Sequence, residues 1–200
     1  MPMAKYIAPA PINLPNREWP SRTITKSPIW TSVDLRDGNQ ALPNPMNPEQ
    51  KLEYFQMLCG IGFREIEIGF PSASQEDFDF TRKLIEENLI PENVTIMVLT
   101  QCRPHLIERT FEAIKGAQWV IFHAYCATSE LHMTHVFKMT RESTLEMIVH
   151  AIRKIRALAD EMPETDVRLE FSPEEFTDTD PEFALQVCEA VFETWGKATA

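Results

Sequence analysis

Short runs rich in β-branched and aromatic residues alternate along the chain with longer segments in which apolar residues recur every three or four positions. The first pattern predicts strands and the second predicts amphipathic helices. The strands are predicted at Ile29–Arg36, Glu65–Phe70, Val94–Gln101, Trp119–Cys126 and Val167–Glu174. The helices are predicted at Asn47–Ile61, Gln75–Leu89, Pro104–Lys115, Thr140–Met162 and Asp180–Trp195. The fourth helix has the clearest pattern, because its apolar stripe is broad enough to pack against a sheet.

Strands that alternate with helices indicate parallel strands joined by helical crossovers, since a tight turn cannot join a parallel pair. Five such units fill residues 29 to 195. At roughly 33 residues a unit, eight would need about 270, which is close to the size of an eight-stranded α/β barrel. The chain would then supply the first five units of a TIM (β/α)8 barrel. A doubly wound open sheet is the alternative, and five strands would complete it.

The two faces of the predicted strands favour the barrel. Ile66 and Ile68 alternate with Glu65 and Glu67, and alternate residues of a strand face opposite sides. The fifth strand likewise sets Val167, Leu169 and Phe171 against Arg168, Glu170, Ser172 and Glu174. An open sheet covered by helices on both faces would be almost entirely apolar. In a barrel, the apolar face packs against helices and the polar face lines the lumen. The charges at Glu65, Glu67, Arg168 and Glu170 fit either structural ion pairs or a functional interior.

The first 28 residues differ from the rest. Nine of the fifteen prolines fall within the first 48 residues, so residues 1–28 are predicted to form an extended arm. Residues 29–200 then form the partial barrel. The four cysteines are widely spaced in apolar segments, which indicates buried thiols rather than disulfides or zinc ligands.

Composition narrows the class of protein. The chain is 44% hydrophobic with a formal net charge of −11, which gives nucleic acid no electrostatic reason to bind. No run approaches the roughly 18 apolar residues of a membrane span, and the N-terminus lacks the pattern of a secretory signal. We therefore expect a cytoplasmic protein whose partners are small molecules or proteins.

The predicted C-terminal strand ends carry most of the candidate chemistry, and barrel enzymes build their active sites at those ends. Carboxylates there could bind a hard cation, a guanidinium could bind an oxyanion, and an imidazole could exchange protons. The set suits a metal-bound oxo acid. Its members are Arg36, Asp37, Gly69, Leu99, Gln101, His123, Tyr125, Ser172 and Glu174.

These residues lie in motifs that closely resemble the 2-isopropylmalate synthases. The motifs are DLRDGNQ from Asp34, EIEIGFP from Glu65, VLTQ from Val98, HAY from His123 and EFSPE from Glu170. The first of them marks a wider barrel family of acyl-CoA condensing and cleaving enzymes, including homocitrate and citramalate synthases and hydroxymethylglutaryl-CoA lyases. The GFPSAS run from Gly69 and the SPEEF run from Ser172 resemble the longer type of 2-isopropylmalate synthase. The resemblance covers nearly the whole chain.

The resemblance implies a Claisen-type condensation of acetyl-CoA with 2-oxoisovalerate, giving 2-isopropylmalate and CoA, the committed step toward leucine. It implies Asp37 as a ligand of a divalent ion, Mg2+ before Mn2+ or Zn2+, and a homodimer as the complete form. Arg36 and Glu174 would be catalytic, the first as the guanidinium beside the developing alkoxide and the second in proton transfer. The residues implied around the 2-oxo acid are Arg36, Gln40, Leu99, His123, Tyr125 and Ser172.

One part of the family pattern is absent. Family members take two more metal ligands from a His-x-His pair in a later strand, and this sequence has no such pair. We therefore expect the chain to be an N-terminal fragment, with that pair beyond residue 200. His132 and His135 have helical zinc spacing but no glutamate between them, which favours a solvated loop over a metal site. Homocitrate or citramalate synthase is the alternative enzyme, and a non-catalytic partial barrel that needs a partner chain is the alternative of another class.

Overall fold

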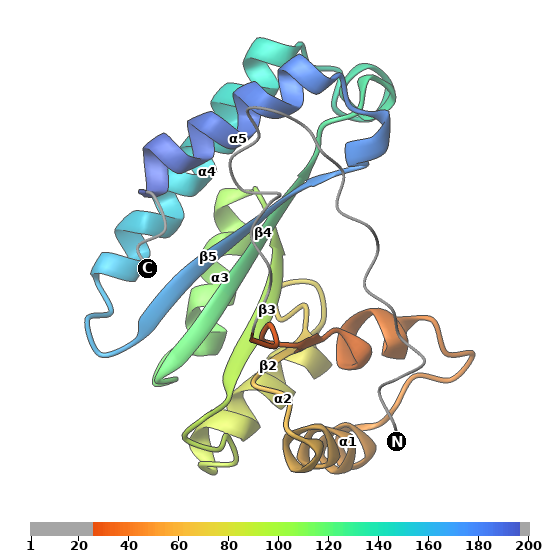
Figure 1. The fold of residues 1–200 in the computed structure, drawn as a ribbon, viewed down its shortest axis with the longest axis vertical. Coiled ribbons are helices and arrows are strands. Elements are labelled where there is room, and N and C mark those ends of the chain that lie inside the picture. Colours follow the sequence, from red (N-terminus) through yellow and green to blue (C-terminus); the bar gives the residue numbers. More distant parts are fainter. Residues whose placement is uncertain (1–25, 197–200) are drawn as a thin grey trace.

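The computed structural model describes residues 26–196 (Figure 1). Most of the predicted N-terminal arm therefore lies outside the described residues. Residues 26–30, which lead into the first strand, are exposed and have no regular secondary structure. The division at residue 28 stays a prediction.

Five parallel strands form one sheet in the order β1-β2-β3-β4-β5. Their bounds are β1 Thr31–Ser32, β2 Glu65–Gly69, β3 Thr95–Gln101, β4 Trp119–Ala127 and β5 Asp166–Glu174. Each crossover moves one strand further in the same direction, whereas a doubly wound sheet reverses its strand order. The strand order therefore contradicts the open-sheet alternative and agrees with the barrel.

Five α-helices connect and follow the strands: α1 Pro48–Ile61, α2 Gln75–Glu86, α3 Pro104–Ile114, α4 Arg141–Asp160 and α5 Pro181–Trp195. All five predicted helices are present, with boundaries that differ by a few residues. Their starts follow the sequence: the side chain of Asn47 caps α1, that of Thr140 caps α4 and that of Asp180 caps α5. Each cap accepts a hydrogen bond from a backbone N–H in the first turn, which would otherwise lack a partner.

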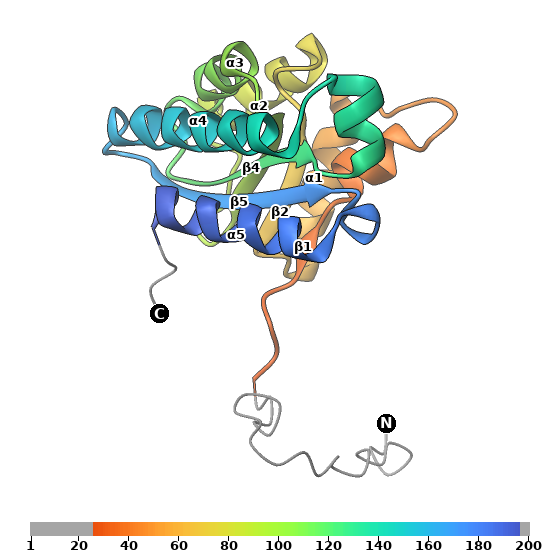
Figure 2. The same ribbon diagram turned by 90° about the horizontal axis from the view of Figure 1, so that it is seen from above.

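The helices pack against the side chains of one face of the curved sheet; Figure 2 shows α2, α3 and α4 on one side of the strands and α5 beside β5. The main core joins Ile66, Ile68, Val98 and Phe122 of the strands to side chains of every helix. Met97, Leu99 and Ile121 are buried but lie outside this core, since they point to the opposite face. That opposite face also holds Glu67 and His123, so the inner face carries the expected polar groups, together with apolar side chains of β3 and β4.

The first strand is much shorter than predicted. Only Thr31 and Ser32 pair with β2, and Asp34–Gly38 form a helical turn, η2. The hydroxyl of Ser32 donates to the Asp34 carboxylate at 2.6 Å, and the carbonyl of Val33 accepts from the N–H groups of Arg36, Asp37 and Gly38. These local bonds compete with the ladder of the sheet. The prediction of a strand through Arg36 is therefore wrong, and the alternation of faces ends at Ser32.

The cysteine prediction is correct in part. All four thiols are free, but only Cys102 and Cys126 are buried, whereas Cys59 and Cys188 are partly exposed. Burial raises the pKa of Cys126 to about 12. No helix within residues 26–196 is long and apolar enough to cross a membrane.

Candidate active site

The carboxylate of Glu67 is the centre of a hydrogen-bonded group on the inner face of the sheet. Glu67 lies in the middle of β2 and has no exposed surface. Its Oε2 accepts from Nε of Arg36 at 2.7 Å, and its Oε1 lies 2.8 Å from Nδ1 of His123. A buried carboxylate needs such partners, because burying an unpaired charge is strongly unfavourable.

His123 continues the group toward β5. Its Nε2 lies 2.8 Å from the hydroxyl of Ser172 and 3.6 Å from the carboxylate of Glu170. Nδ1 of His123 therefore faces Glu67, whereas Nε2 faces both the hydroxyl of Ser172 and the carboxylate of Glu170. The group Arg36–Glu67–His123–Ser172 thus connects residues from η2, β2, β4 and β5. We call it the inner charge network.

A second set of predicted site residues lies beside this network. Leu99, 8% exposed, pairs in register with His123 across β3 and β4. Nε2 of Gln101 donates to the hydroxyl of Tyr125 at 2.8 Å. Burial raises the pKa of Tyr125, so its phenolic hydroxyl keeps its proton at neutral pH. The carboxylate of Glu174, at the end of β5, is exposed and makes no hydrogen bond or ion pair within residues 26–196.

A pocket of about 430 Å³ opens between the ends of β3, β4 and β5 and the loop after β4. Gln101, Tyr125 and Glu174 line it from the strands and Arg103 from the turn after β3. Apolar side chains form the rest of its lining. We call this cavity the strand-end pocket. Apolar pockets with a few convergent polar groups are the usual form of ligand sites. The apolar lining residues are Val136, Phe137, Met139 and Met147.

Two further predicted residues, Asp37 and Gln40, lie on or after η2. Asp37, whose side chain is 49% exposed, forms an ion pair with Arg36. Gln40 is exposed and makes no hydrogen bond to the inner charge network among the described residues. The structure therefore brings Asp37 to the edge of the network and does not bring Gln40 into it.

The described residues do not form a metal site by themselves. Within residues 26–196, no group of three or more His, Cys, Asp or Glu side chains could hold an ion. Asp37 offers the hard oxygen donors that Mg2+ prefers, but one carboxylate is not enough to fix an ion. His132 instead lies 2.5 Å from the Glu175 carboxylate, on a helical turn, η3 (His132–Phe137), rather than in a solvated loop.

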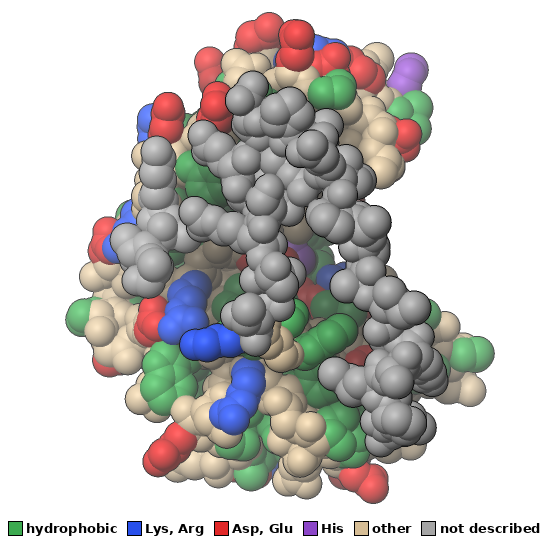
Figure 3. Space-filling view, in the orientation of Figure 1, with side chains coloured by type: hydrophobic (Ala, Val, Ile, Leu, Met, Phe, Trp, Pro, Cys, Tyr) green, Lys and Arg blue, Asp and Glu red, His purple; other side chains and the backbone are tan. Residues whose placement is uncertain are grey.

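Glu67 was not among the site residues predicted from the sequence. Its alternation with Ile66 and Ile68 placed it on the polar face of the strand, but a purely structural ion pair explained that position as well as a functional role did. In the structure the nearest basic groups are Arg36 and His123, both predicted site residues, so Glu67 is part of the same site. Figure 3 shows histidine, acidic and basic side chains together in the recess at the middle of the molecule.

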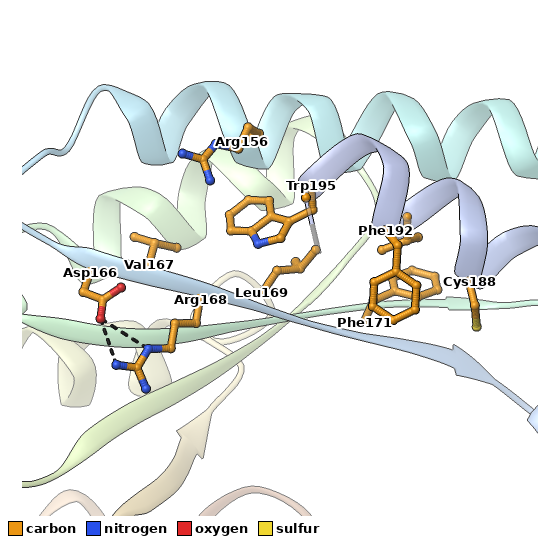
Figure 4. A pocket seen from close by; sticks show the side chains of 11 residues that line it. Arg156, Asp166, Val167, Arg168, Leu169, Phe171, Cys188, Phe192 and Trp195 are labelled. Atoms are coloured by element: carbon orange, nitrogen blue, oxygen red, sulfur yellow. Dashed lines mark hydrogen bonds and ion pairs between the residues drawn. The ribbon is translucent and has the colours of Figure 1, made fainter. Parts of the chain in front are cut away.

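A larger pocket, of about 580 Å³, lies away from this site (Figure 4). It opens between the free edge of β5 and α5, and its walls include Val167, Leu169, Phe171 and Trp195. Val167, Leu169 and Phe171 come from the outer face of β5, and Trp195 comes from the end of α5. Arg168, which also borders it, pairs with Asp166 at 2.9 Å and therefore takes no part in the inner charge network.

Taken together, sequential parallel strands, helices on one face and a polar site at the C-terminal strand ends define the chain as part of a TIM-type α/β barrel. The chain belongs to the HMGL-like family, whose pattern it matches over residues 27–199.

Several 2-isopropylmalate synthases are similar to this chain. That of Clostridium acetobutylicum is 51% identical over 96% of this chain and 35% of its own length. Those of Ralstonia nicotianae and Schizosaccharomyces pombe are 51% identical over 100% of this chain and 34% and 35% of their lengths. The chain thus spans about a third of the length of the curated relatives it matches.

A solved structure supports the fold. The HMG-CoA lyase of Bacillus subtilis superposes with a TM-score of 0.61 at 20% identity, covering 83% of this chain and 54% of the lyase. At that identity the likeness concerns the fold alone. The expected TIM barrel is confirmed by the family and by this structure.

Proposed function

We propose that this chain contributes the N-terminal half of the active site of a 2-isopropylmalate synthase. The observation that supports this best is the inner charge network, which joins residues of η2, β2, β4 and β5 on the inner face of the sheet, next to the strand ends where barrel enzymes act. The identity of about half to 2-isopropylmalate synthases from three sources supports the substrates. Those substrates are acetyl-CoA and 2-oxoisovalerate.

In the proposed reaction, a base removes a proton from the methyl group of acetyl-CoA, and the resulting enolate carbon forms a bond to the keto carbon of 2-oxoisovalerate. The keto oxygen takes up a proton to become a hydroxyl. Water then cleaves the thioester and releases CoA as the free thiol. Atoms and charges balance without an oxidant or reductant.

The 2-oxo acid would bind at the inner charge network. The hydroxyl of Ser172 and the ring of His123 can hold its polar end, and Glu67 keeps both His123 and Arg36 in place. The guanidinium of Arg36 carries the positive charge that stabilises the developing alkoxide. Leu99, next to His123, is the apolar contact proposed for the branched side chain.

The strand-end pocket is our proposed approach for acetyl-CoA. It adjoins the network through Tyr125, and the unpaired carboxylate of Glu174 lines it. Glu174 is therefore the proposed acceptor of the methyl proton. A base must lie within hydrogen-bonding reach of the proton it removes, and the pocket would bring the thioester to that position.

The family is generally dependent on a divalent metal, and Asp37 is the ligand that we propose from this chain, with a His-x-His pair outside this sequence. When bound, the ion would polarise the ketone. Asp37→Asn in the full-length protein should weaken Mg2+ binding, measured by calorimetry, and abolish turnover while thermal unfolding is unchanged. Unchanged Mg2+ affinity would remove Asp37 from the metal site. A homodimer and a cytoplasmic location stay predictions.

The function is tested by offering acetyl-CoA and a panel of 2-oxo acids to the full-length protein and measuring release of the free thiol. We expect 2-oxoisovalerate to react best. If only 2-oxoglutarate or pyruvate reacts, the chemistry stands and the substrate is wrong, as for homocitrate or citramalate synthase. If none reacts, the proposed function is wrong.

A further inference from the structure

A compact group of polar side chains joins the segments that follow β4 and β5. Ser129, after β4, donates its hydroxyl to the carboxylate of Glu175, and Nδ1 of His132 lies 2.5 Å from the same Oε2. The hydroxyl of Ser129 also accepts from the backbone N–H of His132 at 3.2 Å. We call Ser129, His132 and Glu175 the β4–β5 clamp.

Two threonines, Thr128 and Thr179, add hydrogen bonds that involve the backbone of these segments. The N–H of Thr128 donates to the carbonyl of Glu174 at 3.1 Å. The hydroxyl of Thr179 donates to the carbonyl of Glu175 at 3.0 Å and lies 2.8 Å from that of Thr128, which is fully buried. The carbonyl groups of two successive residues therefore both accept hydrogen bonds: that of Glu174 from the segment after β4 and that of Glu175 from Thr179.

The backbone of Glu175 has an unfavourable conformation that these contacts maintain. Its φ is 58° and its ψ is 40°, in the left-handed region. A glutamate, with its Cβ, adopts that region far less readily than glycine or asparagine. Such conformations persist only where the surrounding structure holds them, and they cluster at functional sites.

The residue directly before this strained position is Glu174. Its carboxylate has no partner within residues 26–196, so no side-chain contact sets its direction. The backbone must set it instead, and that backbone is held on one side by Pro173, which fixes φ, and on the other by Glu175. The carboxylate of Glu175 is bound by Ser129 and His132, so the two neighbouring carboxylates have different surroundings.

The pKa of Glu175 is consistent with a carboxylate that accepts both of these hydrogen bonds. The hydrogen bond from Ser129, and to a smaller extent His132, lower the pKa of Glu175. The carboxylate therefore stays ionised and accepts both bonds at neutral pH. His132 also lines the strand-end pocket together with Glu174, so the clamp and the unpaired carboxylate border the same space.

From this geometry we infer that Ser129, His132 and Glu175 are positioning residues: they hold the turn after β5 so that the free carboxylate of Glu174 faces the strand-end pocket. The inference rests on the proposed function, in which Glu174 accepts the methyl proton. None of the three clamp residues touches the inner charge network, so they should affect proton removal and not binding of the 2-oxo acid.

The test compares Glu175→Gly with Glu175→Gln in the full-length protein. Glycine adopts the left-handed conformation without strain but removes the clamp, so kcat for thiol release should fall about tenfold or more. The KM for 2-oxoisovalerate should stay within about twofold, since the network that would bind it is intact. Glutamine keeps an oxygen that accepts from Ser129, so Glu175→Gln should retain most of kcat. Glu164→Gln, an exposed glutamate without a partner among the described residues, is the matched control.

Three outcomes would overturn the inference. The first is an unchanged kcat in Glu175→Gly when Glu174→Gln has lost activity, which leaves the proposed function standing. The second is a parallel rise in the KM for 2-oxoisovalerate, which indicates a general structural role. The third is no thiol release by the unmodified protein with any 2-oxo acid, which removes the proposed function as well. If Glu175→Gly does not fold, Ser129→Ala tests the same bond, with the same predicted fall in kcat.

Discussion

At the scale of single residues, the arrangement depends on one buried carboxylate. Glu67 has no exposed surface and is held by Arg36 and His123. The negative charge of Glu67 balances the guanidinium of Arg36, whose side chain is only 16% exposed. Removal of one partner of a buried pair leaves the other charge uncompensated, which is much more unfavourable than loss of an exposed pair.

Glu67→Gln should therefore lower the free energy of unfolding by roughly 3 to 5 kcal/mol. Urea unfolding followed by circular dichroism measures this change. The control is Arg168→Gln, which breaks the exposed pair with Asp166 and should change stability by less than about 1 kcal/mol. Equal effects of the two substitutions would contradict the central role of Glu67 in the fold.

The thiols give a second prediction at this scale. Only the thiolate reacts rapidly with iodoacetamide. Burial raises the pKa of Cys102 well above its usual value and that of Cys126 to about 12. At pH 8 both should stay unlabelled in the folded protein, whereas Cys188, at the open pocket beside β5, should react. Mass spectrometry of tryptic peptides would show the order, and rapid labelling of Cys126 would contradict it.

At the scale of elements, the strand-and-helix pattern was predictable because the periods of two and of about four residues are properties of local sequence. The end of the first strand was not predictable, because hydrogen bonds around Ser32, Asp34 and the carbonyl of Val33 replace strand pairing with a helical turn. This turn is also what lets Arg36 reach Glu67. Local side-chain competition of this kind leaves no periodic signal.

The candidate site was also predictable only in part. The parallel topology brings the strand ends together, and the structure places Arg36, His123 and Ser172 in one network as expected from that rule. Gln40 follows the irregular turn, and its exposed position could not be derived from strand alternation. The clamp at Glu175 depends on a contact across 43 residues with His132, which no local pattern contains.

Gly69 ends β2 and approaches the side chain of Asp77 in α2 closely. Gly69 has φ +154°, and a Cβ there would lie 2.7 Å from the carboxylate of Asp77. That carboxylate cannot easily move, because it pairs with the buried Lys51 and accepts from the N–H of Phe70 at 2.7 Å. The close approach therefore requires glycine.

Gly69→Ala should lower the free energy of unfolding by about 1 to 3 kcal/mol, through backbone strain and displacement of Asp77. Gly60→Ala is the matched control, since Gly60 lies in α1 with nothing within 4 Å of the added Cβ. That change should stabilise the helix by about 0.5 to 1 kcal/mol. Thermal melts of both variants measure the difference, and similar melting temperatures would contradict the account of Gly69.

At the scale of the whole molecule, the sheet formed by residues 26–196 ends at β1 and β5, and neither edge pairs with a further strand of that range. Apolar surface near the second edge is extensive: Leu185 is 59% exposed, Phe192 is 55% exposed, and Trp195 lines the adjoining pocket. Free strand edges and apolar patches of this kind promote association. The chain of 200 residues produced alone should therefore self-associate.

Size-exclusion chromatography coupled to light scattering tests this expectation. Phe192→Lys should shift the isolated chain toward the monomer, while Leu131→Lys, which changes an apolar residue 64% exposed directly before η3, should not. A monomeric unmodified chain would show that the β5 edge is protected by other means.

In the proposed function, carbon–carbon bond formation from an acetyl methyl group takes place at this strand-end site. The most direct measurement offers acetyl-CoA with a fully deuterated methyl group, together with 2-oxoisovalerate and Mg2+, to the full-length protein and determines the product by mass spectrometry. We predict 2-isopropylmalate that retains two deuterium atoms, in equal amount to free CoA, and loss of this product in Arg36→Gln. Absence of 2-isopropylmalate, or its undiminished formation by Arg36→Gln, would contradict the account.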